Sequence, residues 1–291
     1  MGLSIRGTSR KSWITQINAA AASLSPEFAV MSQCAYMKVS QSAMPVRRFK
    51  TFYGATMVGD VTDFVLKRIC FFGVFEPSMT QFMIRTIKPG DTVVDLGANH
   101  GYFTLLMSKL VGRTGRVIAI EAFPKTCRSL EDNLALNGIT NVEVRGVAIS
   151  DRKGSIEMVA PNPFNSGMTT TLVDNHAGAR INVPSDTLMS VLGDARSVSF
   201  IKIDIEGAER APLMDILTNR SVFSRPLTIA SEVSESNSDL AAAFKEAGFE
   251  TQLISNEYDW RAYLKVEQAD VNLHAVDERR SETDDYIFRL P

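Results

Sequence analysis

The stretch Val93-Val94-Asp95-Leu96-Gly97-Ala98-Asn99-His100-Gly101 decides the fold. Its first residues predict a short buried strand that ends in an acid, and its glycines predict a tight turn. The apolar run at residues 102–111 predicts a helix directly after that turn. A strand, a turn and a helix in this order begin an open α/β sheet, whose ligands bind at the carboxyl ends of the strands. We therefore expect a ligand at this turn.

Short Val- and Ile-rich runs alternate with amphipathic runs of helix length after residue 88, which predicts a mostly parallel α/β sheet. We predict seven strands, the last two of them pairing in antiparallel fashion at one edge: 92–96, 116–121, 142–148, 198–203, 227–232, 249–254 and 285–290. Residues 1–88 show helical pieces and no clear strand, so we expect a helical cap ahead of a ligand-binding domain at 89–291. The polar segment 150–185 breaks the alternation and predicts an inserted hairpin or lid.

Composition excludes several classes of protein. With 291 residues, 45% of them hydrophobic and 22% charged, the chain resembles ordinary globular proteins. No apolar run approaches the roughly 18 residues of a membrane span. The net charge of −2 gives no bias toward nucleic acid, although residues 1–50 are basic. Cys34, Cys70 and Cys127 fit neither a disulfide framework nor a zinc pattern, so we expect a reducing, cytoplasmic setting.

The chemistry of the turn favours one ligand class over another. A dinucleotide-binding turn reads G-x-G-x-x-G, and Asn99 stands where its second glycine belongs. The negative charge of Asp95 also disfavours a pyrophosphate and favours a ligand that carries an ammonium and a sulfonium group. Glu121 ends the second predicted strand, where a carboxylate accepts hydrogen bonds from the ribose of either ligand. The alternative for Glu121 is to cap the helix that begins at Pro124, and we favour ligand binding.

Further acids end the predicted strands 198–203 and 227–232. Asp204 follows the first of these strands, and Glu232 ends its neighbour, which puts the two carboxylates about 5 Å apart at one sheet edge. Such a pair could hold a divalent cation such as Mg²⁺, or one member could act as a general base. Glu206 and Glu209 are expected to open the next helix and to stabilise its N-terminus.

Five segments together resemble the FkbM-type methyltransferases. They are Gly-Val-Phe-Glu-Pro (73–77), Lys-Pro-Gly-Asp-x-Val-Val-Asp-Leu-Gly-Ala-Asn-x-Gly (88–101), Asn-x-Ala-Leu-Asn-Gly (133–138), Val-Ala-Ile-Ser-Asp (147–151) and Ile-Lys-Ile-Asp-Ile-Glu-Gly-Ala-Glu (201–209). The resemblance implies a class I, Rossmann-like methyltransferase fold that binds S-adenosylmethionine. It also implies O-methylation of a hydroxyl on a sugar, a polyketide or a similar small molecule.

The resemblance also implies roles for particular residues. The methionine end of the cofactor is expected to lie against Asp95, Gly97, Asn99 and Gly101. The ribose is expected at Glu121, the adenine beside Ala148 and a further cofactor contact at Glu76. Asp204 is expected to face the methyl group or its acceptor, and the candidate bases are Asp204, Glu232 and, in the insert, His176.

One departure from the family pattern keeps alternatives open. The family usually has Thr-Leu-Asp before its fourth strand, whereas this chain has Met189 in place of that Asp. A protein that binds S-adenosylmethionine without turnover is one alternative, and a methyltransferase acting on RNA or protein is another. The sequence names neither the acceptor nor the oligomeric state.

Overall fold

A computed structural model describes the part of the chain in which the predicted sheet lies. The described residues are 45–159, 180–195, 197–223, 225–233, 239–256, 263, 266, 271, 273–276 and 284–291. His176, Cys34 and most of the basic N-terminal stretch lie outside these residues, so the predictions made for them are left as predictions.

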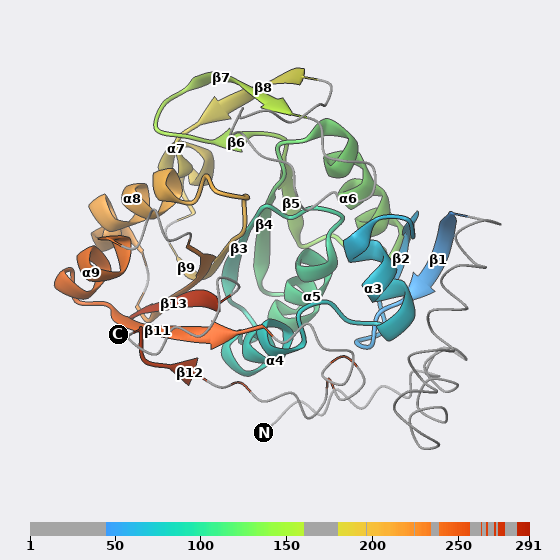
Figure 1. Ribbon diagram of the computed structural model, residues 1–291, viewed down its shortest axis with the longest axis horizontal. Coiled ribbons are helices and arrows are strands. Elements are labelled where there is room, and N and C mark those ends of the chain that lie inside the picture. Colours follow the sequence, from blue (N-terminus) through green and yellow to red (C-terminus); the bar gives the residue numbers. More distant parts are fainter. Residues whose placement is uncertain are drawn as a thin grey trace.

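One eight-stranded sheet forms the centre of the molecule (Figure 1). In spatial order its strands are β12 (Leu273–His274), β11 (Glu250–Ser255), β13 (Asp284–Leu290), β10 (Leu227–Glu232), β9 (Val198–Ile203), β3 (Thr92–Leu96), β4 (Arg116–Ile120) and β5 (Val142–Arg145). Strands β10, β9, β3, β4 and β5 are mutually parallel, whereas β13 runs antiparallel to both of its neighbours. The seven predicted strands are therefore confirmed. The two-residue β12 is an addition, and the last strand lies inside the sheet rather than at its edge.

Two apolar cores cover the two faces of this sheet, because successive side chains of a strand point to opposite faces. On β3, Val93 belongs to one core and Val94 to the other. The first core receives α3 (Phe64–Phe72), α4 (Pro77–Thr86), α5 (Tyr102–Val111) and α6 (Pro124–Leu136). The second receives α7 (Leu188–Leu192), α8 (Arg210–Thr218) and α9 (Asp239–Glu246), which lie on the left in Figure 1.

The described residues before β3 contain the expected helical pieces, but the expectation of no clear strand is wrong for them. Helices α3 and α4 are present, but an antiparallel hairpin of β1 (Val46–Lys50) and β2 (Thr56–Asp60) precedes them. Each strand has one buried position, Phe49 in β1 and Met57 in β2, and these two residues are paired. So weak an alternation gives no strand signal in the sequence. Both residues join the core that also holds Val93.

The repeated asparagines of the 133–138 segment fasten this hairpin to the sheet. The Asn133 side chain accepts from the Val58 amide at 2.8 Å and donates to the His100 carbonyl at 3.0 Å. The Asn137 side chain accepts from the Thr56 amide at 2.8 Å. An amide side chain both donates and accepts, so one face of α6 ties β2 to the turn after β3.

The segment predicted as an insert holds two described strands that pair with each other. Strands β7 (Gly154–Val159) and β8 (Arg180–Asp186) pair in antiparallel fashion, and β8 also pairs with the two-residue β6 (Ala148–Ile149). The expected strand 142–148 is thus split between two sheets, and the small sheet lies beyond the ends of β4 and β5, at the top of Figure 1. Among the described residues, no helix has the length and apolar character needed to cross a bilayer.

Candidate functional site

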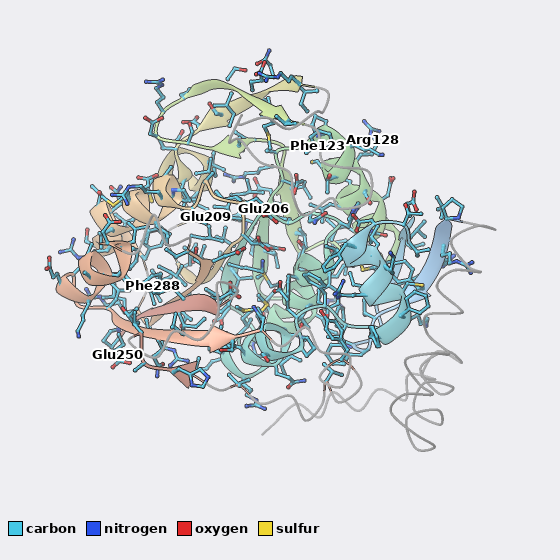
Figure 2. All side chains as sticks on the ribbon, viewed as in Figure 1. Phe123, Arg128, Glu206, Glu209, Glu250 and Phe288 are labelled. Carbon is cyan, nitrogen blue, oxygen red and sulfur yellow. The ribbon has the colours of Figure 1, made fainter. Side chains whose placement is uncertain are left out.

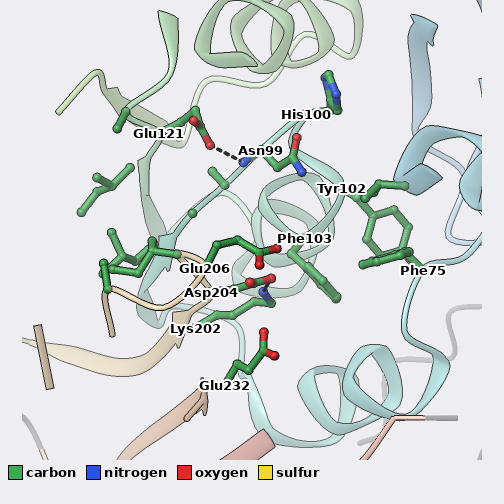
Figure 3. A pocket seen from close by; sticks show the side chains of 18 of the residues that line it. Phe75, Asn99, His100, Tyr102, Phe103, Glu121, Lys202, Asp204, Glu206 and Glu232 are labelled. Carbon is green, nitrogen blue, oxygen red and sulfur yellow. Dashed lines mark hydrogen bonds and ion pairs between the residues drawn. The ribbon is translucent and has the colours of Figure 1, made fainter. Parts of the chain in front are cut away.

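A cavity of about 440 Å³ opens at the carboxyl edge of the parallel strands (Figure 3), a size typical of small-molecule sites. Its walls come from α3, the loop before α4, the turns after β3, β4 and β9, the small sheet and the end of β10. Seven of the predicted site residues line it: Glu76, Gly97, Asn99, Glu121, Ala148, Asp204 and Glu232. Asp95 and Gly101 do not line it, and His176 lies outside the described residues.

Glu121 fastens two turns together at the end of β4. One carboxylate oxygen accepts from the Asn99 amide at 2.8 Å, and the other accepts from the Phe123 amide at 2.9 Å. Phe123 directly precedes α6, whose N-terminus has no side-chain cap hydrogen bond among the described residues. Glu121 therefore fixes the residue before the helix without capping it, and it lies in the cavity wall. Burial raises the pKa of Glu121 to about 7, although both amides act in the opposite direction. Each oxygen keeps a lone pair that a ligand hydroxyl could use.

The glycines of the turn after β3 are required by protein packing. A Cβ on Gly97 would lie 1.7 Å from the Asp204 carbonyl oxygen, and one on Gly101 would lie 2.5 Å from a methyl carbon of Leu130. Both residues also have a left-handed backbone, with φ of 85° and 91°. They therefore let the turn pack against the end of β9 and against α6, which is a different reason from the close ligand approach expected from the sequence.

Asp95 lies beneath the cavity rather than in its wall. It is 1% exposed, and one carboxylate oxygen accepts from the Thr104 hydroxyl at 2.5 Å. Within the described residues its other oxygen has no hydrogen-bond partner. Burial raises the pKa of Asp95, while Lys202, its partner in register on β9, acts in the opposite direction.

Lys202 is a buried cation in the cavity wall that the sequence analysis did not single out. Its ammonium donates to Asp204 at 2.7 Å, and it lies 4.8 Å from the centre of the Phe103 ring. The neighbouring carboxylates of Asp204, Glu76 and Asp95 raise its pKa against the effect of burial, so the ammonium is charged. A lysine inside the apolar run 200–203 was the available signal, because buried lysines are rare unless paired.

The expected metal site is not supported by this arrangement. Among the described residues, no three or more His, Cys, Asp and Glu side chains gather in a way that could hold a metal ion. The Lys202 ammonium lies on the Asp204 carboxylate, where the cation was expected. Asp204 and Glu232 do line the same cavity, as predicted.

The turn after β9 differs from the predicted start of a helix. Helix α8 begins at Arg210, and Glu206 has a left-handed backbone with φ of 51°. Glu209 is 1% exposed and accepts from the amides of Gly207 at 2.8 Å and Ile205 at 3.3 Å, so it holds the turn rather than the helix. Figure 2 labels Glu206 and Glu209 below the small sheet in this view; Glu209 is buried and Glu206 is half-buried.

Backbone strain is concentrated at this cavity. Among the described residues, three that are not glycine have a positive φ: Glu76 at 43°, Asn99 at 49° and Glu206 at 51°. All three line the cavity. A left-handed backbone is unfavourable for most residues with a Cβ, and residues that adopt one are over-represented at functional sites. The sequence gives no sign of this, because the same residue types also occur in ordinary turns.

Two other residues from the sequence analysis are now placed. His100 lies at the cavity wall, and its ring contacts the Ser129 hydroxyl at 2.9 Å, away from Asp204 and Glu206 (Figure 3). Met189 lies on α7 and packs against the second core, and it is absent from the cavity wall formed by the described residues. The family departure at Met189 therefore does not alter the lining of this cavity.

The fold and the cavity define an open α/β protein with a ligand site at the carboxyl ends of its strands. The family model of the methyltransferase FkbM domain matches the sequence over residues 95–264, which is more than half of the chain. The chain belongs to the FkbM methyltransferase family.

Curated relatives match shorter stretches. The protein-L-isoaspartate O-methyltransferase of Methanococcus aeolicus is 38% identical over 58 residues, which are 20% of this chain and 27% of that one. The arsenite methyltransferase of Halobacterium salinarum is 28% identical over 189 residues, which are 64% of this chain and 44% of that one. The chain thus spans less than half the length of these relatives.

Among solved structures, the fibrillarin of Aeropyrum pernix with natively bound S-adenosyl-L-methionine is 13% identical to this chain. The match covers 84% of this chain and 82% of that one, with a TM-score of 0.41. An O-methyltransferase from Thermotoga maritima is 16% identical, with coverages of 84% and 77% and a TM-score of 0.42.

Proposed function

We propose that the protein transfers the methyl group of S-adenosylmethionine to a hydroxyl of a small molecule, such as a sugar or a polyketide. The observation that carries the proposal is the cavity at the carboxyl edge. Glu121 at the end of β4 and the Lys202–Asp204 ion pair at the end of β9 both line this cavity. Family membership favours the same chemistry.

The residues present fit the adenosyl part of this cofactor. The buried Glu121 carboxylate is the acceptor that the two ribose hydroxyls need. Beside it, Ala148, Ile149 and Met158 supply an apolar wall for the adenine. The turn after β3, which places Gly97 and Asn99 in the cavity wall, is where the methionine end of the cofactor would lie.

The cofactor supplies an electrophilic methyl carbon, and the protein has to align an oxygen with it and exclude water. Phe75 and Phe103 supply apolar walls, and α3 covers the cavity with Val65 and Ile69. We assign Asp204 and Glu232 to the acceptor, whose hydroxyls they would hold by hydrogen bonds. A hydroxyl is a weak nucleophile at neutral pH, so a carboxylate must also take its proton.

The charge of the cavity favours a neutral acceptor over an anionic one. Five carboxyl side chains line it, namely Glu76, Glu121, Asp204, Glu206 and Glu232, against the cations Arg68 and Lys202. Burial raises the pKa of Glu121 to about 7 and that of Glu206 to about 8, which reduces the negative charge of the wall, but a phosphate or a carboxylate would still meet more carboxyl groups than cations. This balance disfavours the alternatives of an RNA or an isoaspartyl acceptor, both of which are anionic.

The test is calorimetric titration with S-adenosylmethionine, S-adenosylhomocysteine and NAD, followed by transfer of labelled methyl groups to a panel of sugars and polyketide alcohols with and without Mg²⁺. We expect saturable binding of both adenosyl ligands, no binding of NAD and transfer to a hydroxylated compound. A folded protein that binds neither adenosyl ligand would contradict the proposal. Binding without transfer to any panel member would favour the non-catalytic alternative.

A further inference from the structure

A second, smaller cavity of about 40 Å³ lies beside the large one. It is lined by the ends of β9 and β10, by the start of β13 and by α4. Its wall holds four carboxyl side chains, those of Glu76, Asp204, Glu232 and Asp285, and Lys202 is the one cation among its described residues. All of these except Asp285 also line the large cavity. Asp285 thus belongs to the small cavity alone.

Glu232 and Asp285 lie directly opposite each other where β10 pairs with β13. Residues that face each other across an antiparallel pair have Cβ atoms about 4.5 to 5.5 Å apart, and like charges there are destabilising. One ammonium, which already donates to Asp204 at 2.7 Å, cannot neutralise four carboxylates. The facing pair therefore lowers its energy by keeping one proton between its two groups.

The Asp285 carboxyl group is held in place by a buried amide. The side chain of Asn256, at the end of β11, donates to one Asp285 oxygen at 2.6 Å, and Asn256 is 7% exposed. A protonated carboxyl group donates one hydrogen bond and can still accept others. Asp285 can therefore keep the bond from Asn256 on one oxygen while its second oxygen carries a proton.

The surroundings favour Asp285 as the member of the pair that holds the proton. Burial raises the pKa of Asp285 well above its ordinary value, and the negative charge of Glu76 adds to this effect. Lys202 opposes it, and Asp204 and Glu232 raise the pKa further. Glu232 is the member that reaches the large cavity, and its side chain points toward Lys202 and Asp204 in Figure 3.

We propose that Asp285 is a positioning residue for the methyl transfer, in a role that rests on the function proposed above. It keeps one proton and donates it in a hydrogen bond to Glu232, which stays ionised and acts as the general base. The Glu232 carboxylate takes the acceptor's hydroxyl proton as the oxygen bonds to the methyl carbon. The bond between that carbon and sulfur breaks at the same time, and its electron pair stays on the sulfur. Glu232 then passes the proton to water in the large cavity.

Asp204 fits the role of the base less well. Its protonation would break the ion pair with Lys202 and leave a buried ammonium without that partner. Glu232 can take a proton without this loss, and it has a facing acid on β13. Asp204 is retained as a contact to the acceptor.

The first test measures the proton on Asp285 without any acceptor. Asp285→Asn keeps the shape of the group, one donor and one acceptor, but it cannot ionise. The unfolded wild type releases the proton that the folded wild type holds. The unfolding equilibrium constant of the wild type, divided by that of Asp285→Asn, should therefore rise about tenfold per pH unit between pH 5 and 7. Urea unfolding at several pH values measures this ratio.

Asp239→Asn is the matched control for this test. The hydrogen bonds from Arg210 hold the pKa of Asp239 below its ordinary value, so Asp239 is ionised in both states above pH 5. Its ratio should stay flat over the same range. A flat ratio for Asp285→Asn as well would overturn the assignment.

The second test uses an acceptor found in the panel. Asp285→Asn still donates to Glu232, so it should keep kcat within about threefold and leave the pH profile of kcat unchanged. Asp285→Ala removes the donor that favours the ionised form of Glu232. Its rise in kcat with pH should therefore shift about one unit toward higher pH, with KM within about threefold.

The kinetic outcomes separate this role from the proposed function. A shift toward lower pH in Asp285→Asn would mean that Asp285 is ionised in the wild type, and equal shifts in the Asn and Ala variants would mean that the donor is not used. Either result would overturn the role of Asp285 and leave the proposed function intact. A folded wild type that binds neither S-adenosylmethionine nor S-adenosylhomocysteine would overturn both.

Discussion

The two halves of the cavity are built from the same kind of residue in opposite ways. At the ends of β3 and β4, the Glu121 carboxylate is held by two backbone amides, those of Asn99 and Phe123. At the ends of β9 and β10, the Asp204 carboxylate is held by a side-chain ammonium, that of Lys202. The first half, which we call the cofactor half, is fixed by the main chain. The second, which we call the acceptor half, is fixed by a balance of side-chain charges.

The difference fits what each half has to bind. A cofactor is the same molecule in every turnover, so a site fixed by backbone amides suits it. The acceptor half must change its proton content during each turnover, and a cluster of carboxylates around one buried lysine allows this. We infer that binding and chemistry are separated between the two halves, and mutations should separate them as well.

The largest effect on stability should come from removing the central charge of the acceptor half. Lys202→Met removes the ammonium whose pKa is raised by the neighbouring carboxylates of Asp204, Glu76 and Asp95. Breaking a buried ion pair costs about 3 to 5 kcal/mol, and the lower end applies because the Asp204 side chain is 30% exposed. Urea unfolding at pH 7 measures the loss.

The matched control for that variant is Arg180→Met. Arg180 pairs with Glu157 on the surface, with side chains 53% and 41% exposed, so its loss should cost less than about 1 kcal/mol. Equal losses in the two variants would show that Lys202 does not organise the acceptor half.

The cofactor half should respond in binding more than in stability. Glu121→Ala removes the acceptor of two amides and of the proposed ribose contacts, so we expect S-adenosylhomocysteine to bind about 100-fold more weakly. Glu121→Gln keeps one acceptor oxygen and should lose less. Titration calorimetry separates the two variants, and equal affinity in Glu121→Ala and the wild type would contradict the assignment.

The smallest effect should be a gain in stability. Glu206→Gly relieves a left-handed backbone, and we expect it to raise the free energy of unfolding by about 1 kcal/mol. The gain should be larger at pH 9 than at pH 6. The pKa of Glu206 in the folded protein is about 8, well above that of an unfolded glutamate. The wild type therefore loses stability as the pH rises through the interval between these two pKa values, and the full loss is present at pH 9.

Glu206→Gln is the control for this gain, since it removes the charge and keeps the strained φ. The difference between the Gly and Gln variants in thermal unfolding then reports the backbone alone, and the difference between Gln and the wild type reports the charge. A Gly variant less stable than Gln at both pH values would show that the turn is not strained.

The sequence predicted the parts of the molecule that repeat a strong pattern. The alternation of apolar strands and amphipathic helices gave the seven strands, and the acids at strand ends gave Glu121, Asp204 and Glu232 as neighbours of one cavity. The hairpin of β1 and β2 was missed because each strand buries only one residue.

The parts that were missed depend on details that a periodic pattern does not carry. Asp95 was expected in the wall and does not line it, because it lies within β3, one residue before the strand ends at Leu96, and its carboxylate accepts from Thr104. Glu206 was interpreted as part of a helix, whereas the Glu209 carboxylate accepts from the Gly207 amide in a turn where Glu206 has a left-handed φ. The glycines were predicted correctly as a turn, but their close contacts are with the protein.

The separation of binding from chemistry is tested most directly by measuring the affinity of S-adenosylhomocysteine for Glu121→Ala and Glu206→Gln side by side at pH 7. We predict a loss of about 100-fold in the first variant and a change within about threefold in the second, with both variants folded. Equal losses in the two variants, or a larger loss in Glu206→Gln, would contradict a cavity divided into a fixed cofactor half and a titrating acceptor half.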